Sequence, residues 1–296
     1  MMFTFAVLAA VCIGLPVFYV WRLWRLNRPS MGDWLVAAAE ACLVVMLIVI
    51  VGRWDIVGMP ARFLLLALLA AALVRSLLRH AGRPWRPRKL GVSSLVPVVL
   101  AGGALAYVAT GLTPPDEPAD FAFPLRDGRF VVGQGGDGVL LNHHAGHEAQ
   151  RFAADITAIG PAGFRAAGIL PRDPDRYEIF GKQVVSPCEG TVTVAEDGLA
   201  DLTPPDADAN NPAGNHVVLR CGSLQVELAH LQRGSVAVKP GQVVRTGDLL
   251  GLVGNSGNST EPHLHIHAVL QESGKGVPIT FAGRFPVRNR KFVNQE

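Results

Sequence analysis

The sequence predicts an α-helical membrane region followed by an all-β domain. Before about residue 112 the chain contains apolar stretches of membrane-spanning length, and after it short apolar runs are separated by Gly, Pro and Asp. We therefore expect four transmembrane helices within residues 1–112, a short proline-rich linker over 113–120, and a compact antiparallel β-sheet domain over 121–296.

The expected membrane spans cover residues 3–20, 34–51, 56–74 and 92–110. Residues 3–20 lack a basic start and a small-residue cleavage site, so we interpret them as a retained span. Glu40 lies inside the second stretch. An intramembrane acid is a candidate functional residue, and near a helix end it can also reach the interface, so both interpretations stay open.

Basic residues gather between spans one and two and between spans three and four, at Arg22, Arg25, Arg28, Arg75, Arg79, Arg83, Arg86, Arg88 and Lys89. The positive-inside rule places both loops in the cytoplasm and the C-terminal domain outside it. Residues 1–112 hold 11 Lys and Arg against 3 Asp and Glu, and the remainder holds 16 against 21. The net charge of +3 therefore follows from membrane topology and gives no reason to expect a nucleic-acid partner.

The β domain is indicated by short apolar runs at 130–132, 139–141, 184–185, 191–194, 217–219 and 224–228. Two segments without periodicity, 161–176 and 204–212, are expected to be loops, the second of them mobile. Cys188 and Cys221 lie in this domain, where a disulfide would persist, but the sequence leaves their pairing open.

Three histidines occupy alternate positions in one expected strand, at His263, His265 and His267. Alternate side chains of a strand project from one face, about 7 Å apart, so these rings would form a row. A row of imidazoles suits a divalent metal, because a catalytic zinc takes three protein ligands and keeps one position open. The alternative is a polar strand face with surface histidines.

Five blocks of sequence carry a family resemblance: GNHVVL at 214–219, LAHL at 228–231, VKPGQVV at 238–244, GLVGNSG at 251–257 and PHLH at 262–265. Their order and spacing resemble the LytM/lysostaphin-type zinc metallopeptidases over roughly residues 140–285. The resemblance implies a compact antiparallel β domain that binds Zn²⁺ and cleaves peptides of bacterial peptidoglycan. It further implies His265 as a zinc ligand, and His230 and His263 as catalytic residues.

One element departs from the family pattern. The usual first motif is a histidine four residues before an aspartate, and here Arg151 precedes Asp155 at that spacing. Arginine stays protonated and cannot bind zinc. The nearby NHH at 142–144 resembles a variant group of the family, so His144 is our first candidate for the missing ligand and His147 the second. The implied ligand set is His144, Asp155 and His265.

Two other histidines have less defined roles. His267 could orient another histidine or line the groove, and His216 is expected to be structural or at the surface. With the resemblance, the expected location is the bacterial cytoplasmic membrane, with the catalytic domain outside. A protein activator is left open.

Three alternative functions are less consistent with the sequence. The main alternative is a zinc-free, LytM-like binding module that recognises the wall or activates another wall hydrolase, and Arg151 is its chief support. A biotinyl- or lipoyl-type carrier would need a lysine at a hairpin tip, but no Lys lies between Lys182 and Lys239. A third alternative is a membrane half that senses or transports while the outer domain gates it, with Glu40 as the only indication.

Overall fold

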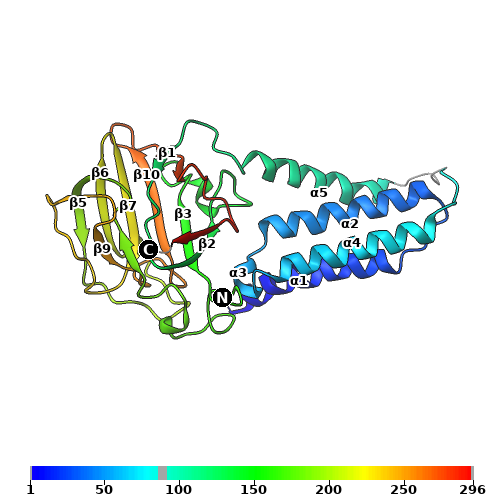
Figure 1. Ribbon diagram of the computed structural model, residues 1–296, viewed down its shortest axis with the longest axis horizontal. Helices are drawn as coiled ribbons and strands as arrows, with labels where there is room; N and C mark the ends of the chain where they lie inside the picture. Colours follow the sequence, from blue (N-terminus) through cyan, green and yellow to red (C-terminus); the bar gives the residue numbers. More distant parts are fainter. Residues whose placement is uncertain (1, 86–91, 295–296) are drawn as a thin grey trace. The chain divides into compact units, whose positions relative to one another are not determined.

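The structure is a computed structural model that describes residues 2–85 and 92–294 (Figure 1). The chain forms two compact units, one over Phe3–Ala109 and the other containing Thr110–Glu296. The finer division at residues 112 and 120 stays a prediction. Arg86, Arg88 and Lys89 of the expected basic loop lie outside the described residues.

The first unit is helical, with α1 (Met2–Trp24), α2 (Met31–Val51), α3 (Trp54–Val57), α4 (Ala61–His80) and α5 (Val92–Thr110). Helix α2 starts after Ser30, whose hydroxyl accepts a hydrogen bond from the Asp33 amide at 3.1 Å, as an N-cap does. The expected span 56–74 is wrong in its bounds. Gly58 has a φ of 94°, and the fixed φ of Pro60 suits a helix start, so α4 begins at Ala61.

The expectation of four membrane spans is also wrong as stated. Among the described residues, two helices are long and apolar enough to cross a membrane by length and composition, Met31–Val51 and Ala61–His80. Shorter apolar stretches occupy Ala10–Trp24 and Leu95–Thr110, below the about 20 residues that span a bilayer. In the two long apolar windows 28% and 22% of the residues are buried, and the other side chains are partly or fully exposed.

Glu40 is buried between two partners. Its carboxylate accepts hydrogen bonds from the hydroxyl of Tyr19 and from the guanidinium of Arg22, each at 3.1 Å to Oε1. A buried carboxylate is costly unless it is paired and hydrogen-bonded. Pairing with Arg22 therefore accounts for the burial of this acid within an apolar helix.

The second unit is built on a nine-stranded antiparallel sheet, which confirms the expected β domain (Figure 1). Its strands run in the order β13 (Lys291–Asn294), β2 (Gly128–Gln134), β3 (Ala154–Ala158), β10 (Leu264–Leu270), β7 (Leu224–Leu231), β6 (Asn215–Cys221), β5 (Gly190–Glu196) and β8 (Val243–Val244), with β11 (Gly276–Val277) also paired to β10.

Two smaller sheets complete the unit. Strand β4 (Gln183–Val185) pairs antiparallel with β9 (Leu249–Leu252), and β1 (Ala119–Phe121) pairs parallel with β12 (Ile279–Phe281). Because Ala119 is opposite Ile279, the last residues of the expected linker already lie in a strand.

Strand alternation separates the core from the face that carries the polar site. On β10 and β7 the even-numbered side chains Leu264, Ile266, Val226 and Leu228 are fully buried in the main apolar cluster. The odd-numbered side chains point to the opposite face. His265 is therefore on the polar face of the sheet.

Cys188 and Cys221 form a disulfide with their Cα atoms 6.2 Å apart, which answers the pairing that the sequence left open. The bond links residues 33 positions apart. Closing a loop of that size stabilises the folded state by about 3–4 kcal/mol, because the unfolded chain loses entropy.

Candidate metal centre

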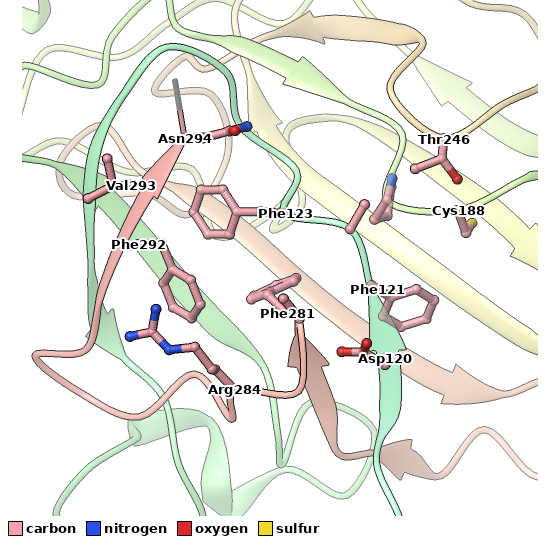
Figure 2. Close-up of a pocket in the computed structure, with 13 residues that line it drawn as sticks. Asp120, Phe121, Phe123, Cys188, Thr246, Phe281, Arg284, Phe292, Val293 and Asn294 are labelled. Atoms are coloured by element: carbon pink, nitrogen blue, oxygen red, sulfur yellow. The ribbon is translucent and has the colours of Figure 1, made fainter. Parts of the chain in front are cut away.

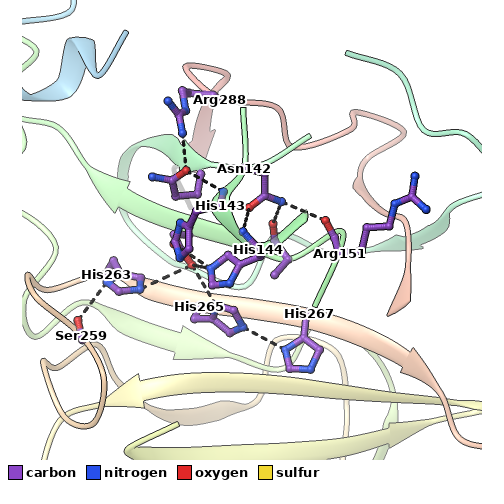
Figure 3. Close-up of polar contacts among 12 residues, drawn as sticks. Asn142, His143, His144, Arg151, Ser259, His263, His265, His267 and Arg288 are labelled. Atoms are coloured by element: carbon purple, nitrogen blue, oxygen red, sulfur yellow. Dashed lines mark hydrogen bonds and ion pairs between the residues drawn. The ribbon is translucent and has the colours of Figure 1, made fainter. Parts of the chain in front are cut away.

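Asp155 contacts three histidines, His144, His263 and His265, whose rings are labelled in Figure 3. Asp155 and His265 are directly opposite in the pairing of β3 with β10, and Nδ1 of His265 is 2.9 Å from Oδ1 of Asp155. Both are buried, with 8% and 3% of Asp155 and His265 exposed. Burial opposes ionisation of Asp155, but the surrounding imidazoles of His263, His144 and His265 hold the pKa of its carboxyl well below its usual value.

His144 reaches the same carboxylate from the short helix η1 (His143–Gly146). Its Nε2 is 3.1 Å from both oxygens of Asp155. Burial alone would lower the pKa of His144, but the charge of Asp155 together with hydrogen bonds to Asp155 and Gln150 raises it above its usual value. The structure thus brings together His144, Asp155 and His265, the three residues expected as ligands.

Asn142 holds η1 in place, a role that the sequence analysis missed. Its Oδ1 accepts a hydrogen bond from the His144 amide at 3.1 Å, and its Nδ2 donates to the carbonyls of Gly136, Arg151 and Ala153. The side chain is completely buried. An Asn directly before a short helix is a typical N-cap, so the signal was present in the sequence.

Arg151 lies apart from this cluster. Its guanidinium forms a two-point ion pair with Asp137, at 2.9 and 3.0 Å, and stacks over the ring of Phe152. His147, the second candidate ligand, is exposed at the end of η1. His143 is nearer, since one ring nitrogen of His143 lies within 4.8 Å of ligand atoms of His144 and Asp155.

His230 belongs to β7 but departs from strand geometry, with a φ of 64°. A regular strand would direct this even-numbered side chain into the core. The left-handed backbone instead brings its ring within 5.9 Å of the His265 ring and 4.7 Å of the His263 ring. Burial holds the pKa of His230 well below its usual value, so the ring is neutral at neutral pH.

Both expected catalytic histidines are oriented by backbone carbonyls. Nδ1 of His230 donates to the carbonyl of Ser256 at 2.9 Å, and Nδ1 of His263 donates to the carbonyl of Glu261 at 2.8 Å. A carbonyl only accepts, so the neutral form of each ring has its hydrogen on Nδ1 and a lone pair on Nε2. Nε2 of His263 lies 3.6 Å from Oδ1 of Asp155.

The loop that carries Ser256 is fixed by a close approach of two backbones. A Cβ on Gly214, which has a φ of 62°, would lie 2.5 Å from the carbonyl oxygen of Ser256. The Ser256 hydroxyl accepts from the Asn215 amide at 2.9 Å and donates to the Leu231 carbonyl at 2.7 Å. Glycine at 214 thus allows the approach that places the carbonyl used by His230.

A buried ion pair joins Arg165 to Glu261, the residue whose backbone carbonyl orients His263. Nε of Arg165 is 2.7 Å from Oε2 of Glu261, and only 1% of Arg165 and 7% of Glu261 are exposed. Arg165 also donates to the Ile169 carbonyl at 2.8 Å. Segment 161–176, expected to be a loop, is therefore held by Arg165 to Glu261, whose carbonyl orients His263. Sequence patterns do not indicate this pair, because its members are 96 residues apart.

His267 contacts His265 directly, with Nδ1 of His267 3.1 Å from Nε2 of His265. Burial lowers the pKa of His267 to about 3, so its ring is neutral. His216 lies outside this cluster, and its Nδ1 donates to the carbonyl of Gly214 at 2.8 Å, which agrees with a structural role.

A separate pocket of about 680 Å³ lies beside β1, β12 and β13 (Figure 2). Its wall includes the rings of Phe121, Phe123, Phe281 and Phe292, and Arg284 extends over Phe292. None of the clustered histidines lines it. This pocket is therefore distinct from the histidine cluster around Asp155.

The donor set around Asp155 fits zinc. One carboxylate and two imidazoles converge with nitrogen-to-oxygen distances of 2.9–3.1 Å. Mixed nitrogen and oxygen donors of this kind suit zinc, whereas calcium and magnesium prefer oxygen donors alone. Three protein ligands also leave a position for water or substrate, as in catalytic zinc sites.

Comparison with known proteins finds a similarity to a peptidase family within this unit. Residues 177–278 match the model of Peptidase family M23. Peptidoglycan DD-endopeptidase ShyA of Vibrio cholerae is 34% identical over 109 residues, which are 33% of this chain and 24% of that protein. An uncharacterized metalloprotease of Haemophilus influenzae is 37% identical over 86 residues, 29% of this chain and 15% of that protein.

A solved zinc-containing peptidase of Vibrio cholerae aligns at 28% identity with a TM-score of 0.27, over 34% of this chain and 26% of that one. The chain thus spans about a quarter or less of the length of these relatives. The matched residues include His230, His263 and His265, while His144 and Asp155 precede them.

Proposed function

We propose, from the premise that residues 177–278 form a LytM-type domain of peptidase family M23, that the chain is a membrane-anchored zinc endopeptidase that hydrolyses peptide bonds of bacterial peptidoglycan. The observation that carries the proposal is the convergence of His144 and His265 on the buried carboxylate of Asp155. These three residues would hold the zinc ion.

The arrangement also supports separate roles for the metal ligands and for His230 and His263. A bound zinc ion would act as a Lewis acid and would lower the pKa of a bound water to about 7. His230 and His263 each present Nε2 as a base, because their Nδ1 atoms are occupied by carbonyls. In the proposed reaction the water oxygen attacks the peptide carbonyl carbon. One Nε2 takes a proton from the water and delivers it to the leaving amine as the carbon–nitrogen bond breaks.

The substrate class rests on the M23 domain and on the relative named as a peptidoglycan endopeptidase. Peptidoglycan lies outside the cytoplasmic membrane, so the domain has to be extracytoplasmic. An anchor is supported by α2 and α4, whose outward side chains include Leu35, Phe63, Leu64 and Leu78. We propose residues 1–112 as this anchor, 113–120 as the linker and 121–296 as the catalytic domain.

The full-length chain is expected to release new amines from purified peptidoglycan near neutral pH. A chelator should abolish the release and added zinc should restore it. The rate should fall below about pH 6, because protons then compete with the metal for the imidazole of His144, whose pKa is raised. His216→Ala, outside the cluster, is the matched control and should keep the activity. A zinc-loaded chain that binds wall fragments without releasing amines would favour the binding-module alternative.

Membrane topology is a second test. The positive-inside rule places the basic residues before α2 in the cytoplasm, and α2 and α4 together return the chain to that side. An outside domain therefore requires a further crossing between Arg83 and the domain. A reporter that is active only outside the cytoplasm should be active after Glu296 and silent after Arg83. The reverse pattern would separate the domain from the wall and refute the proposed substrate.

A further inference from the structure

The polar face of the sheet does not end at the candidate metal centre. His265 contacts Asp155 through Nδ1 at 2.9 Å and His267 through Nε2 at 3.1 Å (Figure 3). On the neighbouring strand β7, Glu227 is directly opposite His267. One carboxylate oxygen of Glu227 and one ring nitrogen from each of His265 and His267 all lie within 4.8 Å of one another.

These contacts determine the tautomer of His265, that is, which of its two ring nitrogens carries the hydrogen. Nδ1 of His265 faces the Asp155 carboxylate, which only accepts, so in the pairing seen here Nδ1 donates. Nε2 then accepts from Nδ1 of His267. For Nδ1 to bind a metal, its hydrogen has to move to Nε2, which then becomes the donor and needs an acceptor.

His267 suits both arrangements, because a neutral imidazole nitrogen either donates or accepts. When Nε2 of His265 donates, Nδ1 of His267 accepts and the hydrogen of His267 moves to its own Nε2. No net proton is gained or lost in this exchange. Glu227 has a carboxylate oxygen within 4.8 Å of a ring nitrogen of His267, which places an acceptor for that hydrogen beside the ring.

We propose that His267 and Glu227 are positioning residues that hold the ring of His265 with Nδ1 directed at the metal and thereby set the affinity for zinc. The proposal rests on the proposed function for the identity of the metal. Partners of a ligating histidine that fix its tautomer typically change metal affinity about 10- to 100-fold when they are removed. His267 is buried, so water does not readily replace it.

The test measures zinc affinity of the full-length chain by competition with a chromophoric chelator, without substrate. His267→Leu removes both hydrogen-bonding nitrogens and should weaken zinc binding about 10- to 100-fold. His267→Gln keeps a donor and an acceptor and should recover part of the loss. Glu227→Gln should weaken binding, and Gln225→Ala, two residues away on the same strand, should leave it unchanged.

Cobalt substitution separates positioning from general destabilisation. The visible absorption bands of bound Co²⁺ should shift in His267→Leu, because the orientation of His265 changes, and should be unaltered in Gln225→Ala. If His267→Leu fails to fold, Glu227→Gln carries the test. Wild-type zinc affinity in the folded His267 or Glu227 variant would overturn the proposal.

The stoichiometry is a further check. One zinc ion per chain is expected. A second ion that is lost in Glu227→Gln would show a separate cation site at Glu227, His265 and His267 and would overturn the positioning role. A chain that binds one zinc ion with these mutational effects but leaves peptidoglycan intact would refute the proposed hydrolysis, while the positioning role would stand.

Discussion

Replacing Asp155 with Ala is expected to remove both zinc and activity, whereas His230→Ala and His263→Ala should keep the zinc and lose turnover. Asp155 supplies the carboxylate on which His144 and His265 converge, so its removal leaves these two rings without the oxygen donor between them. His230 and His263 instead face backbone carbonyls through Nδ1 and offer Nε2 for proton transfer. Losing one such group should lower kcat by about 100- to 10,000-fold.

Metal analysis and peptidoglycan turnover are measured on the same full-length preparations. His144→Ala should behave like Asp155→Ala, because Nε2 of His144 contacts both carboxylate oxygens. His147→Ala is its matched control, since that ring is exposed at the end of η1. Equal zinc loss in the Asp155, His230 and His263 variants would contradict this division of roles. Undiminished zinc affinity in His144→Ala would move the third ligand to a neighbour such as His143.

Strand periodicity explains why much of this site could be predicted from the sequence. His265 and His267 share a face because they alternate with Leu264 and Ile266, which are fully buried. His230 is a different case, because simple alternation would place it in the core. Its left-handed φ reverses the direction of the side chain, and nothing in its own identity signals that conformation. The family resemblance, rather than the periodicity, indicated its role.

Contacts between distant segments were beyond prediction from a single sequence. The nearness of Glu227 to His267 depends on the register of β7 against β10, which the chain acquires only when the sheet forms. The choice between His144 and His147 likewise depended on η1, whose position is fixed by Asn142. The expected helical span 56–74 was displaced because local turn residues, Gly58 and Pro60, outweigh hydropathy in setting a helix start.

The second large effect concerns the ion pair of Arg165 and Glu261. Glu261→Gln should destabilise the β domain by about 3–5 kcal/mol, because it leaves a buried guanidinium without its carboxylate. It should also lower kcat, because loss of the ion pair loosens the segment whose backbone carbonyl at residue 261 fixes the tautomer of His263. Amide hydrogen exchange at β10 measures the stability of this domain within the full-length chain.

Two comparison variants test whether the unpaired charge of Arg165 causes the loss of stability in Glu261→Gln. Arg172→Ala breaks an ion pair with Asp206 at 3.8 Å whose side chains are 74% and 66% exposed, so its effect should stay within about 1 kcal/mol. Replacing both buried partners with apolar residues, Arg165→Met with Glu261→Leu, should recover much of the stability, because no unpaired charge remains. If the double variant were as unstable as Glu261→Gln, an uncompensated charge would not be the cause. If Glu261→Gln kept both its stability and its kcat, the pair would be neither an anchor for segment 161–176 nor a support for His263.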